Sequence, residues 1–141
     1  MIFIDANVVS ETLRIDGNKA VDAWLARQDA ELAISTVALA ELHAGIEKIR
    51  PGERAARLDA GLNEWRKRLA GRIFAFNEEA ALRYGSLIGA AARRGITVAM
   101  PDGMIAATAL VHGGRLATRN IKDFAALGLE LINPWDDLGN S

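Results

Sequence analysis

Three acidic residues have the type and the setting for metal chemistry. Asp5 follows an apolar run at residues 1–4, Glu41 lies within a helical pattern, and Asp102 lies where another helix begins. Burying an unpaired carboxylate is costly, and three carboxylates that converge would raise one another's pKa. A divalent cation would remove that repulsion, and ligands that are all oxygen favour Mg²⁺ or Mn²⁺ over zinc. Such an ion with coordinated water suits the cleavage of a phosphodiester bond.

Two of these acids also have a simpler structural explanation. Asp5 could be a helix N-cap or a turn residue, since aspartate is common in both roles. Asp102 could stabilise the helix that it begins, because a helix N-terminus favours a negative charge. Glu41 has no such explanation, because its neighbours on the same helix face are apolar or small, namely Val37, Ala38, Ala44 and Gly45.

Acidic residues elsewhere have basic partners on the same expected helix. Glu47 is followed by Arg50 three positions on, and Glu64 is followed by Arg68 four positions on. The stretch from Glu47 to Arg72 is rich in Lys and Arg. It could receive a polyanion, or it could form a solvated helix face.

Apolar patterns and capping residues divide the chain into short strands and helices. Strands are expected at residues 1–5, 32–34, 72–76, 115–118 and 130–132. Helices are expected at residues 8–13 after an Asn7 cap, and at 18–28, 36–49, 53–70, 78–94, 101–112 and within 119–126. This alternation predicts a three-layer α/β/α fold with a central parallel sheet of about five short strands, in one domain over residues 1–141. The carboxyl ends of such strands are where sites are built.

The expected helix at residues 53–70 carries a narrow apolar seam. Its members recur at helical spacing and are Ala55, Leu58, Leu62, Trp65 and Leu69. A seam of this width packs against another helix. We expect an intramolecular contact, with a dimer contact as the alternative.

Composition excludes several classes of protein. Half of the residues are hydrophobic and a quarter are charged, which is typical of a globular chain. The net charge of −1 gives no global basic field, and the lack of cysteine excludes disulfides, thiolate metal sites and cysteine nucleophiles. No apolar stretch approaches the roughly 20 residues that span a bilayer, and the N-terminus lacks a signal-peptide pattern. We therefore expect a cytoplasmic protein with no membrane segment.

Five sequence blocks occur in order along nearly the whole chain. They are IDANVVSE at residues 4–11, STVALAEL at 35–42 with Gly45, PDGMIAATA at 101–109, ATRN at 117–120 with Asp123 and Phe124, and INPW at 132–135. In this order and at this length the chain resembles the PIN-domain family. The likeness is greatest to its VapC-type toxin ribonucleases, which include a FitB-like subgroup. The resemblance implies a PIN-like α/β fold.

The resemblance also implies an activity and a set of site residues. It implies a Mg²⁺- or Mn²⁺-dependent endoribonuclease that is the toxin of a type II toxin-antitoxin system. Asp5, Glu41 and Asp102 would be the metal ligands. The family's fourth acidic position falls at Asn120, which completes the expected catalytic set without adding charge. Asp123 could substitute for the missing acid.

Smaller features surround these positions. Asn7 could form hydrogen bonds within the site or could cap a helix. Arg119, which follows a strand, could contact the scissile phosphate or pair with acids. Ala6 stands where the family commonly carries Thr or Ser, so a hydroxyl is missing there. Gly103 replaces the more usual Ala and is expected to loosen the helix start by about 0.5–1 kcal/mol.

The resemblance implies partners as well. These are a cognate VapB-type antitoxin that keeps the enzyme inactive, an RNA substrate and a second copy in a homodimer, with DNA contacted only through the antitoxin. One alternative is a catalytically weak PIN-fold binding module that works through its antitoxin partner, which Asn120 leaves open. Another is a signalling receiver domain, which also binds Mg²⁺ at a strand-end Asp. Such domains usually need paired acids after the first strand, and here Asp5 is followed by Ala6.

Overall fold

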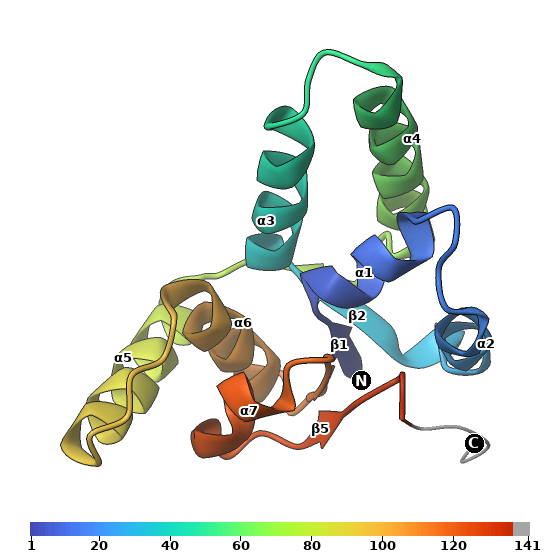
Figure 1. Ribbon diagram of the computed structural model, residues 1–141. Helices are drawn as coiled ribbons and strands as arrows, with labels where there is room; N and C mark the ends of the chain where they lie inside the picture. Colours follow the sequence, from blue (N-terminus) through green and yellow to red (C-terminus); the bar gives the residue numbers. More distant parts are fainter. Residues whose placement is uncertain (137–141) are drawn as a thin grey trace.

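Five short strands form one parallel sheet at the centre of the molecule (Figure 1). The computed structural model describes residues 1–136, so the last part of the expected domain, residues 137–141, lies outside the described residues. The strands are β1 (Ile2–Ile4), β2 (Leu32–Ser35), β3 (Ile73–Phe74), β4 (Arg115–Ala117) and β5 (Leu131–Ile132). Their order is β3-β2-β1-β4-β5, and every neighbouring pair is parallel. The predicted parallel sheet of about five short strands is therefore confirmed.

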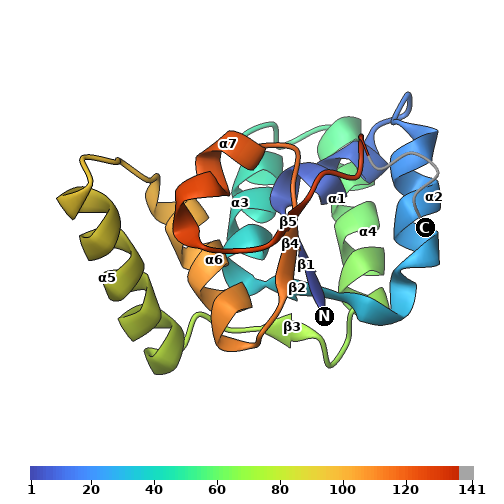
Figure 2. The same ribbon diagram turned by 90° about the horizontal axis from the view of Figure 1, so that it is seen from below.

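Helices cover both faces of this sheet. Figure 2 shows α5 and α6 on one side of the strands and α2 and α4 on the other, which confirms the three-layer prediction. The helices are α1 (Ala6–Leu13), α2 (Lys19–Arg27), α3 (Thr36–Glu47), α4 (Glu53–Arg68), α5 (Glu78–Arg93), α6 (Met100–Val111) and α7 (Ile121–Phe124), with 3₁₀ turns η1 (Asp29–Glu31) and η2 (Ala125–Leu127). None of the helices in residues 1–136 has the length and apolar character needed to cross a membrane.

The core lies where the central strands meet the helices. All residues of β1 and β2 are buried, and large side chains such as Phe3, Trp24 and Phe124 are fully enclosed. Burial of each such side chain contributes roughly 1.5–3 kcal/mol. This apolar packing fixes the carboxyl ends of β1 and β4 relative to each other, which positions the residues that follow them.

The apolar seam of α4 packs inside the molecule, as expected. Ala55, Leu62 and Trp65 are buried, and α4 contacts both α3 and α1. The indole N–H of Trp65 donates a hydrogen bond to Thr12 Oγ1 at 2.9 Å. The intramolecular interpretation is therefore confirmed for these residues.

Several element boundaries differ from the expectation. Helix α1 begins at Ala6 with Asp5 as its N-cap, so the predicted Asn7 cap was wrong. Helix α6 begins at Met100 after Ala99, one residue before the predicted Pro101. Strand β3 has only two residues, Ile73 and Phe74, of the five expected.

One predicted ion pair is also wrong. Glu64 lies 3.4 Å from Lys67 Nζ rather than pairing with Arg68. The Arg68 guanidinium instead contacts Asp29 at 2.6 Å, because the helix packs beside η1 and offers a partner from a distant part of the chain. The predicted pair between Glu47 and Arg50 is present at 3.0 Å.

Gly103 has a packing role that the helix-propensity argument did not anticipate. A Cβ at this position would lie 2.7 Å from Tyr84 Cε1 and 3.0 Å from Ile88 Cδ1. Both neighbours belong to α5, which packs closely along α6. Glycine therefore allows the two helices to approach at the turn that carries Asp102.

Candidate active site

Asp5 is held rigidly where β1 passes into α1. One carboxylate oxygen, Oδ1, accepts a hydrogen bond from the Ala6 N–H at 2.8 Å and thereby caps the helix. The other oxygen, Oδ2, accepts from Asn7 Nδ2 and from the Thr118 hydroxyl, both at 2.9 Å. Asp5 is only 4% exposed. The capping alternative is therefore confirmed, and two further donors fix Asp5 more firmly than a cap requires.

Glu41 and Asp102 complete a group of acids around Asp5. Burial raises the pKa of Glu41, and the charges of Asp5 and Asp102 raise it further. Burial also raises the pKa of Asp102 to about 6, with contributions from Asp5 and Asp123. We call Asp5, Glu41, Asp102 and Asp123 the acidic cluster. Helices α1, α3, α6 and α7 each carry or adjoin one of its members, so the fold brings distant segments together.

The pKa of Asp5 shows two opposing effects. Burial raises this pKa, and the charge of Asp123 adds to the rise. Hydrogen bonds from Thr118, Ala6 and Asn7 lower it, because each donor stabilises the ionised carboxylate. The net direction is upward, so the ionised form of Asp5 lacks full compensation within the protein.

The acidic cluster has no basic partner in the part of the chain that the structure describes. None of its four carboxylates forms an ion pair within residues 1–136. Carboxylate oxygens are the ligands that Mg²⁺ and Mn²⁺ prefer. In the same residues no three His, Asp or Glu side chains surround a point that could hold an ion. The charge and the donor atoms therefore fit a hard cation, although the side chains do not enclose one.

Thr118 is a site residue that the sequence argument did not single out. It follows β4, and the register that pairs Ile4 with Ala117 places it beside Asp5. Its side chain is fully buried, donates to Asp5 and accepts a hydrogen bond from the Asn120 N–H at 3.0 Å. It supplies a hydroxyl beside Asp5, the group that Ala6 lacks. A polar residue at the carboxyl end of a strand was the signal available in the sequence.

The auxiliary residues have distinct settings. Asn7 donates to Asp5 and accepts a hydrogen bond from the Arg119 N–H at 3.3 Å, so it links the ends of β1 and β4. The Arg119 guanidinium lies 5.0 Å from the centre of the Trp135 ring and pairs with no acid in residues 1–136. Asn120 precedes α7 without a side-chain capping bond.

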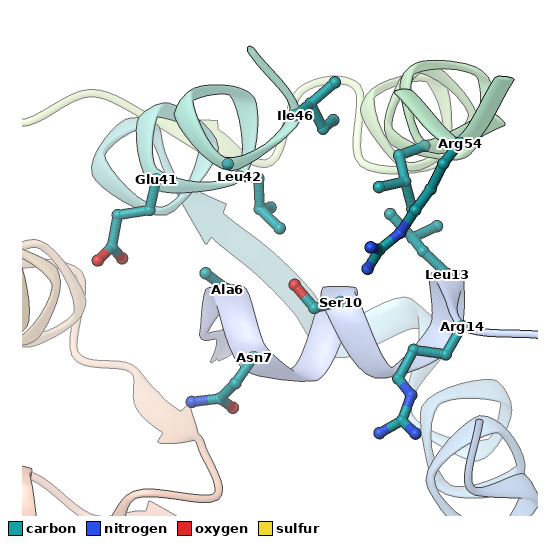
Figure 3. A pocket seen from close by; sticks show the side chains of 11 residues that line it. Ala6, Asn7, Ser10, Leu13, Arg14, Glu41, Leu42, Ile46 and Arg54 are labelled. Atoms are coloured by element: carbon teal, nitrogen blue, oxygen red, sulfur yellow. The ribbon is translucent and has the colours of Figure 1, made fainter. Parts of the chain in front are cut away.

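A cleft of about 460 Å³ opens beside the acidic cluster, between α1, α3 and α4. Figure 3 shows Glu41 and Asn7 pointing toward one end of it, while Arg54 reaches in from α4 at the other. Its apolar floor includes Leu42 and Ile46. A ligand much larger than an ion can therefore lie next to the acids.

Comparison with known proteins identifies the family. A sequence model of the PIN domain matches residues 2–128. The chain belongs to the PIN-domain family.

Relatives of this PIN domain place it among the VapC-type toxin ribonucleases. It is 38% identical to VapC ribonuclease Y4jK of Sinorhizobium fredii, covering 96% of this chain and 99% of the relative. It is 37% identical to the toxin FitB of Neisseria gonorrhoeae, covering 97% of this chain and all of the relative. The crystal structure of FitAcB from Neisseria gonorrhoeae superposes with a TM-score of 0.89 at 36% identity, covering 96% of this chain and 99% of that one.

A further structure shows a relative in an assembly with DNA. VapBC2 from Rickettsia felis, solved bound to a DNA fragment from the promoter, matches this PIN domain with a TM-score of 0.81. The identity is 26%, and the match covers 94% of this chain and 98% of that one. The predicted family and fold are confirmed, whereas the roles of individual site residues stay predictions.

Proposed function

We propose that this VapC-type PIN domain cleaves RNA phosphodiester bonds with a Mg²⁺ or Mn²⁺ ion held by Asp5, Glu41 and Asp102. The observation that supports this most strongly is the acidic cluster itself. Burial and the neighbouring carboxylates raise the pKa of Asp5, Glu41 and Asp102, and the cluster has no basic partner in residues 1–136. A bound divalent cation would relieve this repulsion.

The protein's own groups would position and activate the reactants. Thr118 and Asn7 hold Oδ2 of Asp5 in one orientation through hydrogen bonds of 2.9 Å. A carboxylate of the acidic cluster that the ion leaves free would accept the proton of the attacking water as a general base. The metal ion, when bound, would lower the pKa of water and offset charge on the phosphate oxygens.

Other members of the site would have supporting roles. Asn120 stands at the family's fourth acidic position and brings no charge, so Asp123 is the residue that adds a fourth carboxylate to the cluster. Arg119 would contact the scissile phosphate after leaving its stacked position on Trp135. We expect this arrangement to favour one firmly held ion over two.

The partners that we propose follow those of the relatives. FitAcB and VapBC2 were solved as complexes, and the latter also holds promoter DNA. We propose that this chain pairs with a VapB-type antitoxin, forms a homodimer and meets DNA only through the antitoxin. RNA is its substrate, and single-stranded loops are the accessible targets.

A cleavage assay tests the proposal. Purified protein is incubated with total bacterial RNA in the presence of Mg²⁺, Mn²⁺ or excess EDTA. The proteins compared are the unmutated chain (the parent), Asp5→Asn, Glu41→Gln and the control Asp59→Asn. The parent and Asp59→Asn should cleave only with metal, and Asp5→Asn should neither cleave nor arrest growth on expression. Asp59 pairs with Arg50 on the α3–α4 side and lies outside the cluster. If Asp5→Asn cleaves RNA and arrests growth like the parent, the proposal is wrong.

Two observations favour an alternative function, that of a binding module with weak catalytic activity. Asn120 adds no charge at the fourth position, and within the described residues no three side chains surround a metal site. Both features would suit a catalytically weak binding module that acts through its antitoxin. In that case the parent would bind no metal at millimolar Mg²⁺ or Mn²⁺ and would leave RNA intact in the same assay.

A further inference from the structure

The two ends of the cleft beside the acidic cluster differ in charge. Glu41 and Asn7 line the end next to the cluster, and Arg54 lines the wall formed by α4. Apolar side chains form much of the remaining lining, including Leu42, Ile46 and Leu58. An occupant that fits would carry negative charge near α4 and a flat or apolar group over the floor.

Arg54 places a positive charge where its own helix disfavours one. It lies in the first turn of α4, where the helix dipole disfavours positive charge. It forms no ion pair within residues 1–136, and its guanidinium extends into the cleft in Figure 3. Arg14, which also lines the cleft, is instead paired with Glu11 and Asp16. Arg54 is therefore available to an anionic ligand.

Gly45 leaves open space on the opposite wall. It lies inside α3, where glycine is less favourable than alanine, and a Cβ there would meet no atom within 4 Å. No turn, close approach or positive φ requires glycine at this position. Its contribution is room within the cleft beside Leu42 and Ile46.

We propose that this cleft binds the single-stranded RNA segment next to the cleaved phosphate. Arg54 binds a backbone phosphate of that segment, and the space at Gly45 admits a nucleoside whose base packs on Leu42, Ile46 and Leu58. RNA is favoured because the cleft continues directly from the acidic cluster and because Arg54 complements a phosphate. This inference rests on the proposed function, since it gives the substrate a path away from the reacting bond.

The first test measures RNA binding without cleavage. A short fluorescent single-stranded RNA is titrated with Asp5→Asn protein, alone and combined with Arg54→Gln or Arg57→Gln, over a range of salt concentrations. Arg57 lies on the same helix and outside the cleft lining, so it controls for net charge. Arg54→Gln should bind severalfold more weakly and lower the slope of log affinity against log salt by about 0.7, as for one lost phosphate contact. Arg57→Gln should keep the slope.

The second test fills the cleft. Gly45→Leu adds bulk where the structure leaves space, and Gly85→Leu adds the same bulk at an open helical position on α5. Both variants should keep the circular dichroism spectrum of the parent. Gly45→Leu should raise the KM for RNA cleavage severalfold with a smaller change in kcat, and Gly85→Leu should leave both unchanged.

The outcomes separate this inference from the proposed function. Unchanged RNA binding in Arg54→Gln, or an unchanged KM in Gly45→Leu, overturns the cleft assignment while the parent still cleaves RNA. Such a result is expected if the cleft holds a protein segment instead. A parent that binds RNA through Arg54 and cleaves none refutes the nuclease proposal alone.

Discussion

Glu41 and Glu47 lie on the same helix, yet their carboxylates have opposite surroundings. Glu47 lies at the end of α3 with Asp59 of α4 nearby, and Arg50 contacts the two at 3.0 and 2.6 Å. Arg50 donates hydrogen bonds to Asp59 and Glu47, which raises the pKa of Arg50. We call these three residues the balanced group, because each of the two carboxylates has a cationic partner. Glu41 belongs to the acidic cluster, where the pKa values of Asp5, Glu41 and Asp102 are all raised and no member forms an ion pair within residues 1–136.

This contrast shows what the chain supplies for itself. At the tip of the α3–α4 hairpin, which extends away from the sheet in Figure 1, the protein provides both signs of charge. At the carboxyl edge of the sheet it gathers four carboxylates that form no ion pair within residues 1–136, and hydrogen bonds hold Asp5 rigidly among them. The balanced group stabilises a local structure, whereas the unbalanced group is suited to a positive charge from outside.

Removing one carboxylate from the acidic cluster should have the largest effect. Asp102→Asn keeps the size of the side chain and removes its charge. We expect RNA cleavage to fall by more than the roughly 10–100-fold that follows loss of a supporting hydrogen bond around a metal ligand. The rate at saturating RNA and metal measures this. A variant that keeps the parent's rate would show that Asp102 serves only the start of α6.

Removing the hydroxyl that donates a hydrogen bond to Asp5 should have the next largest effect. Thr118→Val keeps the shape of a buried side chain and removes the hydroxyl that donates to Asp5 Oδ2. We expect metal affinity or activity to fall by about 10–100-fold.

Thr108→Val provides the matched control for this change. Thr108 is also fully buried, but its hydroxyl donates only to the Met104 carbonyl of its own helix. Equal losses of activity in the two variants would mean that a buried hydroxyl matters for packing alone.

The stability of the metal-free protein should depend on pH through Asp102. Its pKa in the folded protein is about 6, against an ordinary value of 3.8, so the folded state binds more protons between these values. Its contribution to the free energy of unfolding is therefore present at low pH and lost as pH rises from about 4 to about 6. The raised pKa values of Asp5 and Glu41 act in the same direction.

Thermal melts in EDTA measure this dependence. The melting temperature of Asp102→Asn minus that of the parent should increase as pH rises through this interval. If this difference in melting temperature stays constant or shrinks, the other carboxylates of the acidic cluster do not repel Asp102.

Breaking the balanced group should have the smallest effect. Asp59→Asn removes one of the two partners of Arg50, and the remaining carboxylate of Glu47 still compensates that charge. Exposed ion pairs contribute little to stability. Chemical denaturation should show a small loss of stability, and RNA cleavage should match the parent. A large loss of cleavage would mean that the balanced group and the acidic cluster do not act independently.

Some of the site follows from local sequence, and some does not. Asp5 could be predicted because an apolar strand ends at it, and Glu41 because its helix face lacks cations. Thr118 could not, because its role depends on the pairing of β1 with β4, which lie more than a hundred positions apart. Gly45 likewise needed the packing of α1, α3 and α4 before its open space was visible.

The errors have physical causes as well. Asn7 was predicted as the helix cap because Asn is a good capping residue, but Asp5 caps α1 and also serves the site. Arg68 was assigned to Glu64 by helical spacing, but Asp29 offers it a tertiary partner at 2.6 Å. Local rules fail where a residue has a choice of partners that only the folded chain presents.

Direct titration of metal tests the central claim that the acidic cluster is unbalanced because it holds a cation. Mn²⁺ is titrated calorimetrically into the metal-free parent, Asp102→Asn and Asp59→Asn at pH 6 in buffers of different ionisation enthalpy. The parent and Asp59→Asn should bind Mn²⁺ alike and release protons, because carboxyl groups with raised pKa must ionise, and Asp102→Asn should bind much more weakly. No binding to the parent at millimolar Mn²⁺, or equal binding by all three proteins, would contradict this account.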